Sequence, residues 1–271
     1  TLTVTFLDTG QGDCALLRTP GGTTVLIDGG SSDIRNAAET RLIPFLEAQA
    51  VDTLDYVFLS HSDDDHVNTV SGWLASGHGI GCLILPALRD SLAAEESYQA
   101  LLTMAEAYQV PLLYFDEGSS WSGDGLSLLC LAPAAPDSPD GSRYSSINAS
   151  SMVLLAEYEG IRFLFTGDCG EEGETMLIQR LRQEDITCHI LKAGHHGSAS
   201  STTTPLLEQL TPQLVVISCG IRNRYRHPHP DMLARVDEQA VPRCITAQCG
   251  AVIVTVQNGK ARIRTMLPTG R

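Results

Sequence analysis

Short apolar runs rich in Val, Ile and Leu alternate along the chain with longer segments whose apolar residues recur at helical spacing. Apolar runs of this length, bounded by Gly, Pro, Asn or Asp, predict β-strands. The predicted strands are Leu2–Leu7, Ala15–Thr19, Thr24–Ile27, Tyr56–Leu59, Cys82–Leu85, Leu112–Phe115, Leu126–Leu131, Met152–Tyr158, Arg162–Thr166, Ile186–Leu191, Leu214–Ser218, Arg243–Thr246, Ala251–Gln257 and Ala261–Met266. Pro20-Gly21-Gly22, Glu159-Gly160 and Asn258-Gly259 are hairpin signals between neighbouring strands.

Segments with an apolar residue at every third or fourth position predict helices. They are Ile34–Ala48, Val67–Ser76, Ser91–Tyr108, Gly170–Arg182, Thr204–Gln209 and Pro230–Ala240. Pro205 and Pro230 stand near two of the helix starts, where the missing N–H is harmless. Each half of the chain has hairpins followed by mixed strands and helices. This order favours two sheets packed face to face with helices outside, a four-layer αββα sandwich of the α+β or α/β class.

The span Ala132–Asn148 is rich in Pro, Ser, Asp and Gly. We interpret it as a long surface loop at the midpoint of the chain, although it is also the one plausible linker. The sequence contains no low-complexity tract and no short-period repeat. We therefore predict a single domain over residues 1–271.

Composition supports a stable globule and narrows the possible partners. Hydrophobic residues make up 43% of the chain, enough for a sizeable core, and no apolar run approaches the roughly 18 residues of a membrane helix. The formal net charge is −14, so the average field repels nucleic acid phosphates. A phosphate-bearing substrate would need local cations or metal ions at its site. Because Thr1 already stands in a strand-like run without a signal peptide, we expect a trimmed domain or a mature product.

The eight cysteines are scattered, with no C-x-x-C pair, and most stand in apolar runs. In a chain of this length they indicate buried thiols rather than a disulfide framework. The even number leaves one or two disulfides open.

The most informative motif is the loop that follows the predicted strand Tyr56–Leu59. It holds five ionisable side chains within six positions, from His61 to His66, immediately before a helix. Imidazole and carboxylate are ligands that divalent metal ions prefer, and His61, Asp63, Asp65 and His66 are enough for two adjacent ions. The alternative is a solvated acidic turn in which Asp64 or Asp65 caps the helix.

Two later strands end in the same kind of polar motif. Asp168 follows the apolar strand Arg162–Thr166 and a glycine, so a rigid element aims a carboxylate that can bridge two metal ions. The alternative is that Asp168 only caps the next helix. The strand before Lys192 opens into Gly194-His195-His196-Gly197, where one histidine can bind metal while its neighbour acts as an acid, a base or a phosphate donor. A plain polar loop is the alternative here.

A fourth motif is basic in this acidic chain. The segment Arg222–His229 holds three arginines, a tyrosine and two histidines. Arginine binds phosphate through two hydrogen bonds and tyrosine can stack on a base, so the segment indicates an anion-binding loop. A solvated basic turn is the alternative.

Taken in order, these motifs resemble the metallo-β-lactamase fold superfamily. Asp8-Thr9-Gly10-Gln11-Gly12-Asp13, Asp28-Gly29-Gly30, the loop ending in Asp63-Asp64-Asp65-His66, Asn148 to Asp168, His195-His196-Gly197-Ser198 and Asn223 to Pro228 are similar, within it, to the C-terminal domain of the ComEC family of bacterial DNA-uptake proteins. The resemblance extends from Leu2 to about Thr255.

The resemblance implies a ligand set and supporting residues. Metal ligands are expected at His61, Asp63, Asp65, His66, Asp168 and one histidine of the pair His195 and His196, of which His196 is favoured. Support from behind the ligands is expected from Asp13, Asp28 and Asn148. Phosphate or substrate contacts are expected from Ser198, Arg222, Asn223, Arg224, Tyr225 and Arg226.

The chain departs from the superfamily pattern at two positions. Asp63 stands where most members have a second histidine, and Asn148-Ala149-Ser150-Ser151 replaces a region that carries another histidine. Oxygen-rich ligand sets suit Mn²⁺ or Mg²⁺ better than a three-histidine zinc site would. The expected cofactor is therefore a pair of divalent ions, Mn²⁺ or alternatively Zn²⁺.

Our first hypothesis is a metal-dependent phosphodiesterase, in particular a nuclease that hydrolyses DNA. Asp65 is required in this scheme, and His195, His227 or Lys192 donates to the phosphate or protonates the leaving group. The alternatives are a hydrolase of a small phosphodiester, such as a choline phosphate ester, and a non-catalytic DNA-uptake module. The resemblance favours an extracytoplasmic location and leaves a cytoplasmic one open.

Overall fold

The computed structural model describes residues 1–268, so residues 269–271 of the predicted domain lie outside the described part. In residues 1–268 the strands form two mixed sheets. The first sheet has the order β15 (Lys260–Thr265), β14 (Val252–Gln257), β1 (Leu2–Phe6), β2 (Cys14–Arg18), β3 (Thr24–Gly29), β4 (Thr53–Phe58), β5 (Gly79–Pro86) and β6 (Leu112–Phe115). The second has the order β13 (Arg243–Ile245), β12 (Leu214–Ile217), β11 (Ile190–Lys192), β10 (Ile161–Phe165), β9 (Val153–Tyr158), β8 (Leu126–Ala132) and β7 (Ser120–Gly123).

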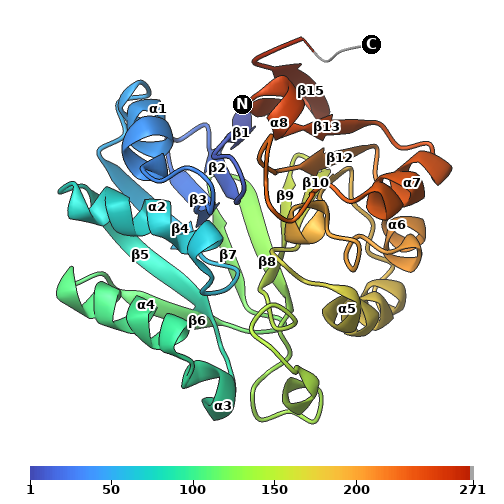
Figure 1. The fold of residues 1–271 in the computed structure, drawn as a ribbon, viewed down its shortest axis with the longest axis horizontal. Coiled ribbons are helices and arrows are strands. Elements are labelled where there is room, and N and C mark those ends of the chain that lie inside the picture. The colour runs from blue at the N-terminus through green and yellow to red at the C-terminus, as the bar shows by residue number, and fades with distance from the viewer. Residues whose placement is uncertain (269–271) are drawn as a thin grey trace.

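Helices cover the outer face of each sheet (Figure 1). The first sheet carries α1 (Ile43–Glu47), α2 (Asp64–Ala75), α3 (Asp90–Ala93) and α4 (Glu96–Ala107), and a π-helical turn, Ala38–Leu42, leads into α1. The second carries α5 (Glu171–Gln183), α6 (Thr204–Leu210) and α7 (Pro230–Glu238), while α8 (Thr246–Cys249) follows β13. The predicted αββα sandwich is confirmed. In the described residues no helix is both long and apolar enough to cross a bilayer.

The core lies in three layers that follow from the alternation of side chains along the strands. Leu2, Val4 and Phe6 of β1 face the second sheet, because every other residue of a strand points to the same side. Phe6 stacks on Phe165 of β10 with ring centroids 5.8 Å apart, which joins the two sheets at their centre. Two further apolar clusters fill the spaces between each sheet and its helices.

Most predicted elements are present, but several boundaries differ. The helix expected from Val67 begins at Asp64, and the helix expected over Ser91–Tyr108 is interrupted between α3 and α4. The helix expected from Ile34 begins only at the π-helical turn, and the strand expected from Ile186 begins at Ile190. Strand β7 and helix α8 were not predicted, because both span four residues, too few for a periodic pattern.

The segment predicted as a surface loop does connect β8 to β9, but it is not confined to the surface. Ala134, Tyr144 and Ile147 are buried, and the Tyr144 hydroxyl accepts a hydrogen bond from the Ala134 N–H at 3.0 Å. Apolar side chains therefore hold this loop against the body of the protein. All eight cysteines are free thiols, and seven of them are buried, as the sequence indicated.

The sheet topology brings the polar motifs to one edge. Strands β3 to β6 are parallel, as are β10 to β13. The carboxyl ends of neighbouring parallel strands meet at the same edge of a sheet, which is where ligands bind in such folds. The motifs after β3, β4, β10, β11 and β12 therefore converge.

Candidate metal centre

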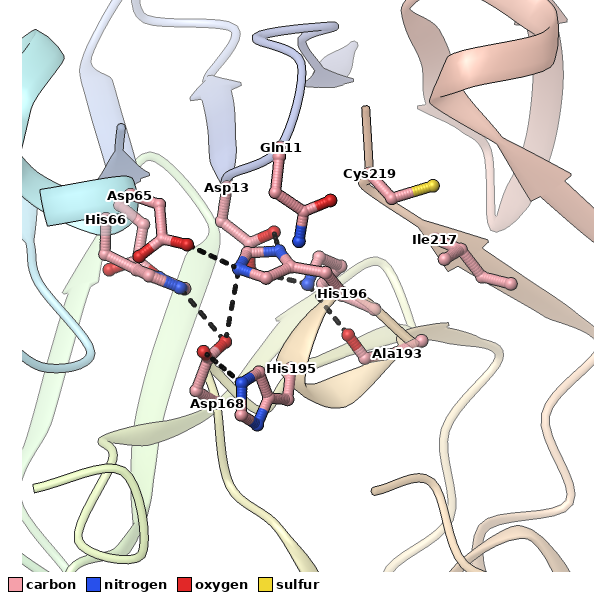
Figure 2. A network of polar contacts seen from close by, with 12 residues as sticks. Gln11, Asp13, Asp65, His66, Asp168, Ala193, His195, His196, Ile217 and Cys219 are labelled. Atoms are coloured by element: carbon pink, nitrogen blue, oxygen red, sulfur yellow. Dashed lines mark hydrogen bonds and ion pairs between the residues drawn. The ribbon is translucent and has the colours of Figure 1, made fainter. Parts of the chain in front are cut away.

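Four buried side chains from the two sheets meet at this edge (Figure 2). Asp13, His66, Asp168 and His196 each bring one nitrogen or oxygen atom into a group in which all atoms lie within 4.8 Å of one another. Asp13 comes from a loop and His66 from the first turn of α2, both beside the first sheet, whereas Asp168 and His196 come from the turns that follow β10 and β11 of the second.

Four buried atoms in and beside this group make no hydrogen bond within the described residues. They are the Nε2 atoms of His61, His66 and His196 and the Oδ1 atom of Asp168. Buried polar atoms in native proteins are nearly always paired, so a cluster of unpaired lone pairs needs a ligand to complete it. Imidazole nitrogen and carboxylate oxygen form the donor set of a divalent metal ion, so the residues present fit such an ion.

The two carboxylate oxygens of Asp168 face different groups. His66 Nε2 lies 3.0 Å and His196 Nε2 3.6 Å from Oδ1. On the other side, His195 Nε2 lies 3.4 Å and His61 Nε2 3.9 Å from Oδ2. A carboxylate shared by two metal ions would have a separate set of ligands near each of its oxygens, as Asp168 has.

Asp63 and Asp65 add one carboxylate to each group. Asp65 Oδ2 lies 3.4 Å from His196 Nε2, and Asp63 Oδ2 lies 3.5 Å from His61 Nε2. The structure thus brings all the predicted ligands together, and it brings both His195 and His196 to Asp168. Their individual roles stay predictions.

The alternative in which Asp64, Asp65 or Asp168 only caps a helix does not fit the structure. The residue that precedes the first turn of α2 is Asp63, in an extended conformation and without a side-chain capping bond, and Asp64 and Asp65 lie inside the first turn. The corresponding residue of α5 is Gly170, not Asp168. The acidic side chains are therefore not used to cap these helices.

A buried aspartate orients His66 from behind. Asp28 lies near the end of β3 with a φ of 56°. Its Oδ1 accepts a hydrogen bond from the Ser60 N–H at 2.7 Å, and its Oδ2 lies 3.0 Å from His66 Nδ1. With Nδ1 donating to Asp28, Nε2 of His66 is the nitrogen available to a metal ion, an arrangement common behind metal-bound histidines.

A second aspartate orients His196 in the same way. Asp13 Oδ1 lies 3.1 Å from His196 Nδ1, and Asp13 Oδ2 pairs with Lys192 Nζ at 2.5 Å. Lys192 is buried and also donates to the Ala193 carbonyl at 2.8 Å. Its position therefore favours neutralisation of Asp13 over the proton donation to substrate that the sequence suggested.

These contacts shift the pKa values of the cluster. Burial lowers the pKa of His66 and of His196, but the facing carboxylates outweigh burial: Asp168 and Asp28 raise the pKa of His66 well above its usual range, and Asp168 and Asp13 raise that of His196 to about 9. Burial raises the pKa of Asp168, but the charges of His66 and His196 lower it well below its usual range. The site is thus a dense set of coupled charges.

Glycines allow the three first-sheet loops to pack backbone against backbone. A Cβ atom on Gly30 would lie 2.2 Å from the carbonyl carbon of Asp65, and one on Gly12 would lie 2.2 Å from the Gly30 carbonyl oxygen. The Asp13 N–H donates to the Asp65 carbonyl at 3.1 Å. The first turn of α2, which carries Asp65, therefore rests on the loop that carries Asp13.

The histidine pair adopts an unusual backbone. His195 and His196 have φ values of 46° and 53°, a left-handed conformation that costs a non-glycine residue roughly 1–2 kcal/mol. The His195 N–H donates to the Gly167 carbonyl at 3.0 Å, which ties the pair to the loop of Asp168. His196 is buried, whereas the His195 side chain is 35% exposed and within reach of a substrate.

The arginine loop, residues 221–227, lies beside the cluster. Its arginines have the predicted exposure, but the contacts of Asn223 differ from those predicted. Arg222, Arg224 and Arg226 are exposed, as an anion-binding loop requires. Asn223 is different, because its side chain donates to the carbonyls of Gly220 and His227 and accepts from the His227 N–H. Asn223 thus closes the loop on itself, and its predicted role in phosphate binding is not the one that these contacts favour.

Tyr225 contacts neighbours on this loop. Its ring stacks on His227 at 5.6 Å between centroids, and the Arg224 guanidinium lies 4.7 Å from the Tyr225 centroid. A cavity of about 180 Å³ is lined by Gln11, Ser32, Asp33, Arg222, Asn223, Arg224 and Tyr225. A base that stacks on Tyr225 would have to share its ring with these contacts.

Three contacts of the site were missed at the sequence level. Ser60 Oγ lies 2.9 Å from His61 Nδ1, the Asp168 N–H donates to Ser151 Oγ at 3.3 Å, and Gln11 contacts His227. Ser151, rather than the expected Asn148, is thus the residue of its turn that contacts the Asp168 loop. Ser60, which directly precedes His61, was the one signal available in the sequence.

Ser198 and His227 complete the predicted set. The Ser198 hydroxyl contacts Ser200 at 3.2 Å, and its phosphate contact stays a prediction. Burial, followed by the nearby charges of His196 and His195, lowers the pKa of His227 to about 4.

Known protein families and relatives agree with this geometry. The model of the metallo-β-lactamase superfamily matches residues 7–125. The ComE operon protein 3 of Bacillus subtilis is 31% identical over 94% of this chain and 33% of its own length, and the competence protein ComA of Neisseria gonorrhoeae is 30% identical over 92% and 31%. The chain therefore spans about a third of the length of these curated relatives.

A solved structure supports the fold. The metallo-β-lactamase fold protein YhfI from Bacillus subtilis covers 97% of this chain and 100% of its own, with a TM-score of 0.58 at 10% identity. Together with the strand order, these matches show that the chain has the metallo-β-lactamase fold.

Proposed function

We propose that this domain is a metal-dependent phosphodiesterase and that its substrate is DNA. The observation that carries the proposal is the division of buried nitrogen atoms between the two oxygens of Asp168: Nε2 of His66 and of His196 lie near Oδ1, and Nε2 of His61 lies nearer Oδ2. This division suits a pair of divalent ions, which in hydrolases of this kind activate a scissile phosphate and the attacking water. The three aspartates make the donor set rich in oxygen, so Mn²⁺ is the favoured ion and Zn²⁺ the alternative.

The chain's own residues divide the remaining work. Asp65, His66 and His196 would hold one ion and His61 and Asp63 the other, with Asp168 shared between them. His195 lies at the exposed side of Asp168, where its ring can contact a phosphate oxygen. Gly12 and Gly30 keep the ligand loops in backbone contact, so the donor atoms are positioned before substrate arrives.

Two observations favour DNA over other phosphodiesters. The arginine loop places three exposed guanidinium groups beside the cluster, and these can bind phosphates on either side of the scissile one. The relatives include a protein named for competence. As part of this proposal, the domain lies outside the cytoplasm, the location that the sequence resemblance favoured.

A small phosphodiester is the second candidate. The cavity beside the arginine loop is small, at about 180 Å³, and the formal net charge of −14 opposes the binding of a long polyanion. The two candidates share the metal centre and differ in what the arginine loop contacts.

Cleavage of labelled single- and double-stranded DNA tests the proposal. The protein is stripped of metal and then supplied with Mn²⁺, Zn²⁺ or Mg²⁺, and Asp65→Ala is compared with Asp64→Ala. Asp64 is a matched control because it is exposed and adjoins Asp65 on the same turn. We expect metal-restored cleavage that Asp65→Ala lacks and Asp64→Ala keeps.

Two results would count against the proposal. Full activity in Asp65→Ala would remove the cluster as the catalytic site. No cleavage of DNA with any metal, together with hydrolysis of bis(p-nitrophenyl) phosphate, would favour the small phosphodiester.

A further inference from the structure

Gln11 links the metal centre to the arginine loop. It stands in the loop between β1 and β2 and is 1% exposed, although an amide side chain has four hydrogen-bonding positions to satisfy. Figure 2 shows its side chain beside those of Asp13 and His196. Its Oε1 lies 3.2 Å from the Gly220 nitrogen, and its Nε2 lies 3.3 Å from His227 Nδ1.

The partner of Oε1 fixes the orientation of this amide. A backbone N–H can only donate, so the Gln11 atom that faces Gly220 must be the oxygen. The NH₂ group then faces His227, and because this group can only donate, Nδ1 of His227 must accept. A histidine whose Nδ1 accepts is neutral and carries its proton on Nε2.

Both residues are held in place by further contacts. The Gln11 N–H donates to Asp33 Oδ1 at 2.7 Å, and the Gln11 carbonyl accepts from the Ser32 N–H at 2.7 Å. On the other side, the Asn223 side chain binds the N–H and the carbonyl of His227 at 2.8 and 2.6 Å. Asn223 thus fixes the backbone of His227, and Gln11 fixes its ring.

Nε2 of His227 has no hydrogen-bond partner among residues 1–268. The ring lies between the two parts of the site: its centroid is 6.4 Å from that of His196 and 5.7 Å from that of His195, and it stacks on Tyr225. A phosphate group that spans the cluster and the arginine loop would pass this ring.

We infer that Gln11 is a positioning residue that holds His227 as the neutral Nε2–H form, so that His227 donates a hydrogen bond to a substrate phosphate oxygen and does not transfer a proton. This inference rests on the proposed phosphodiesterase function. The sequence named His195, His227 and Lys192 as candidates for the proton donor to the leaving group. This inference removes His227, and Lys192 already pairs with Asp13. His195 is the one that remains.

The tautomer of His227 can be measured by NMR, without an activity assay. Long-range ¹H–¹⁵N spectra of metal-free protein labelled at histidine distinguish Nε2–H, Nδ1–H and imidazolium rings, and the His227→Gln variant identifies the signals of His227. We expect the Nε2–H form in the wild type. In Gln11→Glu a carboxylate can still accept from Gly220 but can only accept from His227, so the ring should change to the Nδ1–H or the imidazolium form. Gln257→Glu, at an exposed residue of β14, is the matched control and should leave the tautomer unchanged.

Kinetics with bis(p-nitrophenyl) phosphate then test the consequence. Loss of the donor in His227→Ala should lower kcat about 100-fold, as for other donors to a developing oxyanion, whereas His227→Gln keeps an amide donor and should stay within about tenfold of wild type. Gln11→Met should lower kcat about tenfold with little change in KM.

The outcomes separate this inference from the proposed function. A wild-type His227 in the Nδ1–H or imidazolium form overturns the inference whatever the activity. If the wild type hydrolyses phosphodiesters but His227→Gln is as inactive as His227→Ala, proton transfer by His227 is favoured and the inference fails alone. If no phosphodiester is cleaved while the Nε2–H form is observed, the proposed function fails, and with it the role of His227 toward substrate.

Discussion

The buried cluster and the arginine loop lie side by side but are built in opposite ways. In the cluster, His66 and His196 are each held by a buried carboxylate, and Asp168 lies between the histidines. In the loop, the three arginines are exposed, and in residues 1–268 none of them forms an ion pair. The cluster is fixed before a ligand arrives, whereas the loop offers charge that a ligand can recruit. We therefore expect changes in the cluster to act on chemistry and changes in the loop to act on binding.

The largest effect should come from Asp168, the residue shared by both halves of the cluster. Asp168→Asn keeps the size of the side chain but removes its charge and one of its two acceptor oxygens. We expect activity to fall by about 1,000-fold or more and the bound metal to fall below that of the wild type, measured by phosphodiester hydrolysis and elemental analysis. Asp64→Asn on α2 is the control. Unchanged metal content and rate in Asp168→Asn would mean that the cluster is not the site.

A smaller effect is expected one contact away, at Asp13. Asp13→Asn weakens support of His196, and metal affinity should fall about 10- to 100-fold. It also leaves Lys192 as a buried charge without its partner, which should lower the free energy of unfolding by about 3–5 kcal/mol. Urea unfolding of the metal-free protein measures the second effect.

The double variant Asp13→Asn/Lys192→Met separates the two effects. It removes the uncompensated charge, so stability should recover in part while metal affinity stays low. Recovery of both would show that Asp13 acts on the fold alone.

The pH dependence of metal binding should distinguish the cluster from the loop. His66 and His196 have raised pKa values in the metal-free protein, that of His196 about 9, so both hold protons above the usual range of histidine. A metal ion has to displace these protons, so its affinity should rise with pH by about tenfold per unit for each proton released, and the contribution of His196 should level off near pH 9. Titration with Mn²⁺ at several pH values measures this rise. An affinity that is constant between pH 6 and 9 would contradict the pairing of these histidines with Asp168, Asp28 and Asp13.

The smallest effect is expected in the arginine loop. Arg224→Gln should raise KM for DNA about three- to tenfold. The slope of the logarithm of DNA affinity against the logarithm of salt concentration should fall by about one, as expected for the loss of one phosphate contact. Hydrolysis of bis(p-nitrophenyl) phosphate should be unchanged. Arg143→Gln, at an exposed arginine in the loop between β8 and β9, is the control. Equal losses for both substrates would place Arg224 in the catalytic cluster instead.

The two regions also differ in how far their sequence could predict them. The cluster motifs each follow a strong apolar strand, so periodicity alone placed Asp168 and the His61–His66 loop at strand ends. Helix α2 was predicted, but its start was placed at Val67 and not at Asp64, because an acidic helix start and an acidic loop have the same residues. Pattern reasoning recovers such sites when rigid elements carry them.

The arginine loop depends on contacts that leave no local pattern. Asn223 was taken for a substrate contact because a polar side chain that binds its own backbone has the same sequence appearance as one that binds a ligand. Gln11 was missed as an individual residue because a neutral amide between glycines has no charge signal, and the partners of its side chain lie more than 200 positions away. Only the folded chain shows what these amides bind.

The convergence of ligands from both sheets has a consequence for unfolding. Asp13 and His196 are 183 positions apart, yet their side chains touch, and His66 and Asp168 repeat the same connection between the sheets. An ion bound there would connect the two halves of the sandwich. Because its ligands meet only in the folded chain, it would bind the folded state and not the unfolded one, and so would raise the free energy of unfolding. The two halves should therefore separate together, in a single heat-absorption peak that moves to higher temperature as metal is added.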